Sequence, residues 1–109
     1  MPMLDLSRML ESGVDVLLGY DYGVRARREL GLDDLDRSAE PVVVPFPEHL
    51  DTIAPSFAQG FFGKSVLAHD GRDGFYRAYD FSDWPEDLQL QIDAGVARVL
   101  MDRPAVAAA

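Results

Sequence analysis

Apolar and small residues recur every three to four positions in three segments of the chain, which is the spacing of one face of an α-helix. The first predicted helix covers residues 17–32, the second runs from Pro55 to Leu67 or Ala68, and the third begins near Asp83. Proline in a first turn suits a helix N-terminus. The first helix has a face of small residues that we expect to lie close against a sheet: Gly19, Gly23, Ala26 and Leu30.

Two segments have the composition of strands. Residues 41–45 place three valines between two prolines, and a β-branched run without alternation is typical of a strand buried on both faces. Residues 75–81 are rich in aromatic side chains and follow the turn-forming residues 70–74, which predicts a second strand. The N-terminal stretch 3–10 fits either a strand or a short helix, and its pattern does not decide between them.

Helices and strands alternate in the predicted order, which indicates an α/β fold with helices packed on a small sheet. We expect one domain over residues 1–103, with a sheet of three to four strands and about three helices. A chain of 109 residues is long enough to bury about two-thirds of its unfolded surface. Residues 104–109 have little to bury, so they are expected to fray.

Charge and cysteine content exclude several classes of function. The chain has 19 acidic and 10 basic side chains, a formal net charge of −9, so it would repel nucleic acid and anionic lipid. It contains no cysteine, which removes disulfides, thiolate nucleophiles and cysteine-ligated metal sites. No apolar run approaches the roughly 18 residues of a membrane span, and the first residues do not resemble a secretory signal. We therefore expect a cytoplasmic protein with no nucleic-acid or membrane partner.

The residues that most often carry catalysis or bind metals do not form a recognisable set in this sequence. Gly63-Lys64-Ser65 matches the end of a phosphate-binding loop, but no predicted strand comes directly before that loop and Ala58 replaces its first glycine. This context favours a helix that packs aromatic side chains into the core. His49 and His69 lack the paired spacing of a zinc site, so we expect solvent-facing or capping histidines. No enzymatic activity, metal or cofactor is expected.

Arg25, Arg27 and Arg28 form the basic cluster of the chain. The favoured interpretation is a solvated helix face balanced by nearby acids. The alternative is an anchor for an acidic partner or a phosphoryl group, because a guanidinium binds such groups through two hydrogen bonds. Trp84 lies among acidic residues and is expected to hold the last helix against the sheet; the alternative is an exposed partner-binding residue.

Ser56 follows Pro55 in the first turn of the second predicted helix. The amide groups there have no intrahelical partner and stabilise negative charge, so a phosphoryl group on Ser56 would be favoured locally. The simpler interpretation is a serine whose hydroxyl satisfies one of those amides. Local chemistry favours the simpler interpretation.

The segment from residue 42 to residue 63 resembles the STAS-like domains of unknown function, which are bacterial and mobile-element relatives of anti-sigma-factor antagonists. The shared features are a buried valine strand, a short loop, the helix start Ser56-Phe57-Ala58, and Phe62-Gly63 about a turn and a half later. The likeness extends over residues 17–101. It implies a STAS-like fold for the domain.

The resemblance also implies a non-enzymatic regulatory module that binds a protein partner, such as a kinase-like ATPase or a transcription regulator. In the antagonists the matching turn is Asp-Ser-Ser-Gly, and a partner kinase phosphorylates the second serine, whose position Ser56 occupies. The other three positions hold Ala54, Pro55 and Phe57. We expect Ser56, Thr52 and Phe57 to form the contact surface, switched by phosphorylation near Ser56.

Two alternative functions stay open. Gly63-Lys64-Ser65 and the three arginines would suit a binder of a small phosphate or nucleotide ligand. The acidic surface would suit an accessory protein of a phage or mobile element that blocks a host protein. In either case an exposed strand edge on so small a sheet invites pairing, and a homodimer would cover it.

Overall fold

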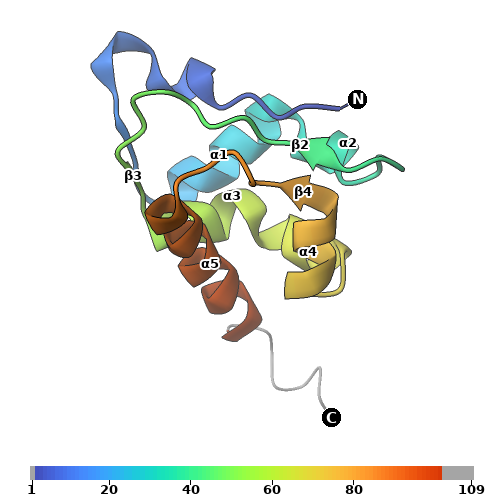
Figure 1. Ribbon diagram of the computed structural model, residues 1–109. Helices are drawn as coiled ribbons and strands as arrows, with labels where there is room; N and C mark the ends of the chain where they lie inside the picture. The colour runs from blue at the N-terminus through green and yellow to red at the C-terminus, as the bar shows by residue number, and fades with distance from the viewer. Residues whose placement is uncertain (1, 102–109) are drawn as a thin grey trace.

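The chain is built around one helix, α3, that lies between two others, α1 and α5 (Figure 1). The structure is a computed structural model that describes residues 2–101, so the tail predicted to fray lies outside the described residues. Its helices are the 3₁₀ helix Ser7–Gly13 and the α-helices Tyr20–Leu30 (α1), Leu32–Leu35 (α2), Pro55–Ala68 (α3), Arg72–Ala78 (α4) and Glu86–Met101 (α5). Its strands are Val16–Leu17 (β1), Val42–Val43 (β2), Thr52–Ile53 (β3) and Tyr79–Asp80 (β4). The described residues form a compact α/β fold.

The three predicted long helices are all present. Helix α3 begins at Pro55 and ends at Ala68, as the pattern predicts. Helix α1 begins three residues later than expected, because residues 16–17 form a strand instead, and it ends where Gly31 takes a left-handed conformation with φ 71°. Helix α5 buries the predicted face, which consists of Leu88, Ile92, Gly95, Val96 and Val99.

The core is formed largely by aromatic side chains of α3. Phe57, Phe61 and Phe62 are all fully buried. The rings of Phe57 and Phe61 stack with 5.2 Å between centroids, and Tyr22 of α1 meets Phe57 edge-on at 5.5 Å. Such pairs add about 0.5–1.5 kcal/mol each beyond the area they bury.

The small-residue face of α1 packs on helix α3 and not on a sheet, which corrects the prediction. A Cβ atom at Gly23 would overlap the carbonyl oxygen of Phe57, and one at Gly60 would overlap the carbonyl oxygen of Tyr20. Glycine at both positions therefore allows the two backbones to touch. On the other side of α3, a Cβ at Gly95 of α5 would lie 2.9 Å from the Pro55 carbonyl oxygen. Helices α3 and α5 therefore also approach each other closely through a glycine.

The predicted single sheet of three to four strands is replaced by two parallel sheets of two strands each. Strand β1 pairs with β3, with Val16 opposite Thr52, and strand β2 pairs with β4, with Val42 opposite Tyr79. Because each strand is two residues long, neither β1 nor β3 has a periodic pattern to reveal it. The finer prediction of a STAS-like arrangement is taken up below.

The N-terminal stretch forms a single β-bridge followed by a short 3₁₀ helix. Met3 forms a bridge to Val43, and the Leu4 amide donates to the Val43 carbonyl oxygen at 2.9 Å. The 3₁₀ helix follows from Ser7. Strand β2 therefore has a neighbour on both sides, and Val42 and Val44 are buried while Val43 is half-buried.

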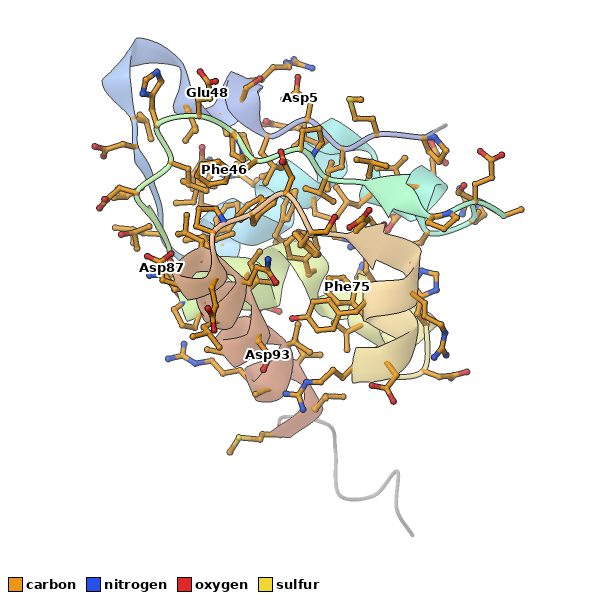
Figure 2. The ribbon with its side chains drawn as sticks, in the orientation of Figure 1. Asp5, Phe46, Glu48, Phe75, Asp87 and Asp93 are labelled. Atoms are coloured by element: carbon orange, nitrogen blue, oxygen red, sulfur yellow. The ribbon has the colours of Figure 1, made fainter. Side chains whose placement is uncertain are left out.

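The predicted aromatic strand over residues 75–81 is wrong for most of its length. Residues 72–78 form helix α4, and only Tyr79 and Asp80 are extended. Phe75 and Tyr79, four positions apart, both point into the core, with Phe75 turned toward the interior between α4 and α5 (Figure 2). Phe75 lies 5.3 Å from Phe62, so packing against α3 outweighs the strand preference of aromatic residues.

Trp84 holds the start of α5 against strand β2, as the favoured interpretation predicts. Its side chain is buried, and its indole Nε1 donates to the carbonyl oxygen of Val44 at 2.8 Å. Phe46 and Phe81 pack against the ring edge-on. In the described part of the chain, no helix has the length and apolar character needed to cross a membrane.

Candidate functional site

Ser56 lies in the first turn of α3, directly after strand β3. Ala54 precedes the helix, Pro55 opens it, and the Ser56 hydroxyl accepts a hydrogen bond from the backbone amide of Gly19 at 3.3 Å. The strand that leads to Ser56 is thus Thr52–Ile53, and the expectation that the valine strand leads there is corrected. The half-buried hydroxyl joins the β1–α1 turn to the start of α3.

Two large apolar side chains are exposed beside this junction. Leu18 and Tyr20 flank Gly19 and are 54% and 51% exposed. Thr52 is half-buried, and its hydroxyl donates to the Asp51 carboxylate at 3.2 Å. The first turn of α3 contains no acidic residue, so the positive end of this helix is not offset by a side chain of its own. We call Leu18, Tyr20, Thr52 and Ser56 the Ser56 surface.

Phe57 does not belong to that surface. Its side chain is fully buried between α1 and α3, so the prediction that it contacts a partner is corrected. A side chain at the third position of a helix is exposed or buried according to how the helix is rotated against its neighbours. That rotation follows from the Gly23–Gly60 contact and is not visible in local sequence.

The three arginines do not form one cluster. Arg25 is exposed and lies 5.7 Å from the centre of the Tyr22 ring, and Arg28 is exposed. Arg27 is only 5% exposed and is directed into the molecule. The favoured interpretation of a solvated face therefore fails for Arg27.

Arg27 is the centre of a buried polar network. One guanidinium nitrogen donates to the Phe61 carbonyl oxygen at 3.1 Å and to the Ser65 hydroxyl at 2.8 Å. The other forms ion pairs with Asp33 at 2.8 Å and Asp36 at 2.6 Å. Two carboxylates compensate the buried charge, as a buried arginine requires. The Nε atom is buried without a hydrogen-bond partner among the described residues.

The pKa values of two groups in this network are shifted. The hydrogen bond and charge of Arg27 lower the pKa of the Asp33 carboxyl. Burial raises the pKa of the Tyr79 phenol well above its usual range, and the hydrogen bond from Tyr79 to Asp36 at 2.6 Å acts in the same direction. Arg27, Asp33, Asp36, Ser65 and Tyr79 thus connect α1, α2, α3 and β4.

The two histidines occupy different settings. His69 follows α3 as its capping residue, and its Nε2 lies 3.7 Å from the Asp36 carboxylate. His49 is exposed and has a left-handed backbone with φ 75°. Among the residues that the structure describes, no group of three metal-binding side chains converges.

Gly63-Lys64-Ser65 lies inside helix α3, as the favoured interpretation predicts. Ser65 is fully buried and bonded to Arg27, whereas Lys64 is exposed. A phosphate-binding loop needs free backbone amides before a helix, and these residues lie within one. The segment therefore cannot act as such a loop.

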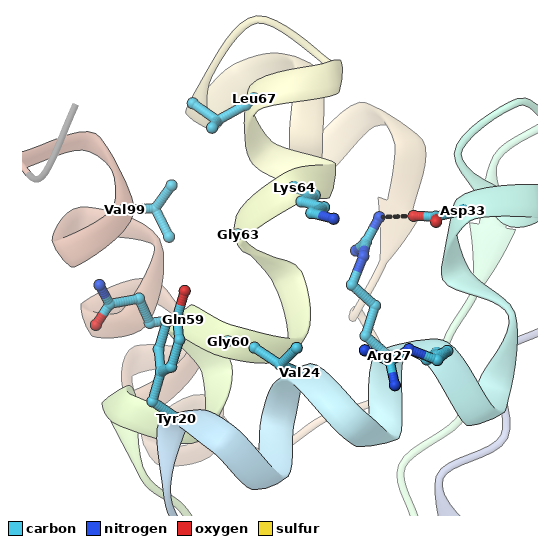
Figure 3. A pocket seen from close by; sticks show the side chains of 11 residues that line it. Tyr20, Val24, Arg27, Asp33, Gln59, Gly60, Gly63, Lys64, Leu67 and Val99 are labelled. Atoms are coloured by element: carbon cyan, nitrogen blue, oxygen red, sulfur yellow. Dashed lines mark hydrogen bonds and ion pairs between the residues drawn. The ribbon is translucent and has the colours of Figure 1, made fainter. Parts of the chain in front are cut away.

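The tertiary structure nevertheless brings Lys64 and Gly63 beside two of the arginines. A groove of about 320 Å³ runs between α1 and α3 and reaches the end of α5 (Figure 3). It is lined by Tyr20, Val24, Arg27, Arg28, Asp33, Gln59, Gly60, Gly63, Lys64, Leu67 and Val99. The sequence suggested Gly63-Lys64-Ser65 and the arginines together only as an alternative ligand site, and it could not show the groove itself, because the walls come from segments as far apart as residues 20 and 99.

Comparison of the chain with protein-family models, with curated proteins and with solved structures finds no match.

Proposed function

We propose that this protein is a non-enzymatic regulatory module that binds a protein partner through the Ser56 surface. The observation that carries the proposal is the exposure of Leu18 and Tyr20 on both sides of the Gly19 amide that holds the Ser56 hydroxyl. Aromatic and aliphatic side chains exposed beside a polar group are characteristic of the centre of a protein interface. The partner contact would therefore form around Ser56.

Phosphorylation of Ser56 would switch this contact. A phosphoryl group adds about −1.5 to −2 charges, and the first turn of α3 presents amide groups with no acid beside them. The modified side chain would also lose its present geometry with Gly19, whose 3.3 Å hydrogen bond is long. The turn that carries Leu18 and Tyr20 would move or stiffen as a result.

The finer proposal is that the domain is STAS-like and acts as anti-sigma-factor antagonists do. The likeness at the Ser56 helix start supports it, and so does the place of Ser56 directly after a parallel strand. The partner would then be a kinase-like ATPase or a transcription regulator. A homodimer is a further proposal, since the two-stranded sheets keep edges that a second copy could pair with.

The test combines partner capture with surface variants. Leu18→Glu should abolish capture of the partner by the immobilised protein, because a carboxylate would replace an apolar contact. Leu90→Glu is the matched control, since Leu90 is 63% exposed on α5 and lies outside the Ser56 surface. Capture that is lost in the first variant and kept in the control supports the proposal.

Mass spectrometry of the protein from cells that contain the partner tests the switch. Phosphate on Ser56, together with altered capture by Ser56→Glu, is the expected result. Equal capture by wild type, Leu18→Glu and Ser56→Glu would refute the proposed surface. Normal capture and signalling by Ser56→Ala would refute the switch alone.

A further inference from the structure

The groove between α1 and α3 has the form of a small-molecule site. Its floor is Gly63, which is half-buried and has no side chain to cover the helix backbone, next to Gly60, which is buried against α1. Its apolar walls are Val24, Leu67 and Val99. The volume of about 320 Å³ lies within the range of pockets that hold small organic ligands. Figure 3 shows Lys64 and Arg27 on one side of this space and Tyr20 with Val99 on the other.

The charged residues of the groove divide into neutralised and available groups. Arg27 is bound to Asp33 and Asp36, so its charge is compensated. Arg28 and Lys64 are exposed, and neither forms an ion pair with a carboxylate in the described part of the chain. The Asp33 carboxylate also lines the groove, so its charged lining consists of three cations and one carboxylate. On a chain with a net charge of −9, this net positive lining with two cations left unpaired points to an anionic ligand.

We propose that this groove binds a small organic phosphate, a phosphomonoester attached to an aromatic or aliphatic body. Arg28 and Lys64 would hold the phosphate, because two cations match its double charge and a guanidinium offers it paired donors. The body would lie over Gly63 between the apolar walls, with the half-exposed ring of Tyr20 beside it. This site shares Tyr20 with the Ser56 surface and differs from it in its charged residues and in the type of ligand.

The glycine at position 63 offers a way to block the groove without disturbing the fold. A Cβ atom there would meet the nearest Val99 methyl group at 3.5 Å, which is ordinary van der Waals contact. Gly63→Ala therefore places a methyl group on the groove floor while keeping the helix. By contrast, Gly60 does not permit this substitution, because its Cβ would overlap the backbone of α1.

Binding is measured with phenyl phosphate as the probe, by calorimetry and by the change in melting temperature. We expect phenyl phosphate to bind and raise the melting temperature, inorganic phosphate to bind more weakly, and phenol not to bind. Benzoate, with one charge instead of two, should also bind more weakly. The dissociation constant for phenyl phosphate should rise with salt concentration, since both cations are exposed.

Variants locate the site. Arg28→Ala and Lys64→Ala should each weaken phenyl phosphate binding about tenfold, the loss of one charge-assisted hydrogen bond. Gly63→Ala should weaken it at least as much while the protein stays folded. Arg25→Ala is the matched control, because Arg25 is exposed on the same helix and does not line the groove.

The outcomes are distinct. Binding that falls in the three groove variants and persists in Arg25→Ala establishes the site. No binding of phenyl phosphate at millimolar concentration would overturn the proposal, as would equal loss of binding in Arg25→Ala and Arg28→Ala. Phenol binding as tightly as phenyl phosphate would show that the phosphate is not recognised and would overturn it as well.

Discussion

The two ends of helix α3 are attached to the rest of the molecule in very different ways. At its start, the Ser56 hydroxyl forms one hydrogen bond of 3.3 Å to the neighbouring turn. Toward its end, Ser65 belongs to a buried network in which Arg27 and Asp36 are 2.6 Å apart. The comparison teaches that the Ser56 hydroxyl contact can change at small energetic cost, whereas the Ser65–Arg27 network fixes the position of α1, α2 and β4 around the helix.

The proposed partner contact and the buried ionic network therefore lie at opposite ends of one helix. The exposed side chains Leu18 and Tyr20 lie at the lightly bonded end, where a partner or a phosphoryl group could alter the structure. The charged residues that are buried serve the fold. The following predictions test this division, beginning with the largest expected effect.

The substitution Asp36→Ala should lower the free energy of unfolding by about 3–5 kcal/mol, because it removes the buried partner of Arg27 and of the Tyr79 hydroxyl. Chemical denaturation measures this change. Asp34→Ala is the control, since Asp34 pairs with Arg37 in full exposure and should contribute less than about 1 kcal/mol. Equal effects of the two variants would contradict the proposed role of the network.

Gly60→Ala should destabilise the protein by about 1–3 kcal/mol, because the new methyl group would overlap the carbonyl oxygen of Tyr20 and force α1 away from α3. Gly63→Ala, on the same helix, should be neutral or stabilise by up to about 1 kcal/mol, since alanine favours the helix and its methyl group has room. Thermal unfolding compares the pair. A loss of stability in both variants would show that the close approach is not specific to Gly60.

Stability should fall at both extremes of pH for separate reasons. Tyr79 has a raised pKa in the folded protein. Its contribution to the free energy of unfolding is therefore fully present below the ordinary tyrosine pKa of about 10, and it is lost progressively as the pH rises above that value. Tyr76 acts in the same direction, because burial and then Asp93 raise its pKa. A Tyr79→Phe variant should show a smaller alkaline loss than wild type in denaturation measured from pH 8 to 11.

The contribution of Asp33 to stability depends on pH in the opposite direction. Because Arg27 lowers its pKa, the ion pair contributes above the ordinary carboxyl value and is lost as the pH falls through the lowered value. Asp33→Asn should therefore reduce the acid dependence of stability below pH 5. If the free energy of unfolding of Asp33→Asn falls with decreasing pH as steeply as that of wild type, Asp33 and Arg27 do not interact in solution.

Ser56→Ala should have the smallest effect, a loss below about 1 kcal/mol, since it removes one long hydrogen bond to a half-buried hydroxyl. Denaturation under the conditions used for Asp36→Ala makes the comparison direct. A loss as large as that of Asp36→Ala would show that the Ser56 end is structural, and the proposed switch would then need another site.

Much of the helical structure could be predicted from the sequence because helix signals are local. Pro55 opens α3 and Gly31 closes α1, and the apolar spacing in α5 persists over its whole length. Strands β1 and β3 could not be found this way, since two residues carry no alternating pattern. The aromatic residues around Phe75 favour a strand when taken alone, but packing of Phe75 against Phe62 of α3 makes the segment helical.

Candidate site residues were harder to predict, and Arg27 shows why. Its neighbours in the sequence suggest an exposed cationic face, yet Asp33 and Asp36 fold back to it from six and nine positions later. That pairing, once formed, allows the guanidinium to be buried, while Arg25 and Arg28 stay outside. Lys64 and Arg28 are separate candidates for an anion site in the sequence, and they share a groove only because α1 and α3 touch through glycine.

The sequence by itself determined the long helices, their ends, the acidic charge and the place of Ser56 at a helix start, since each depends on residues within a few positions of one another. Only the tertiary structure decided which side chains are buried and which share a groove. Those outcomes depend on how α1 and α5 rotate against α3, which is set by contacts between residues that are distant in the chain.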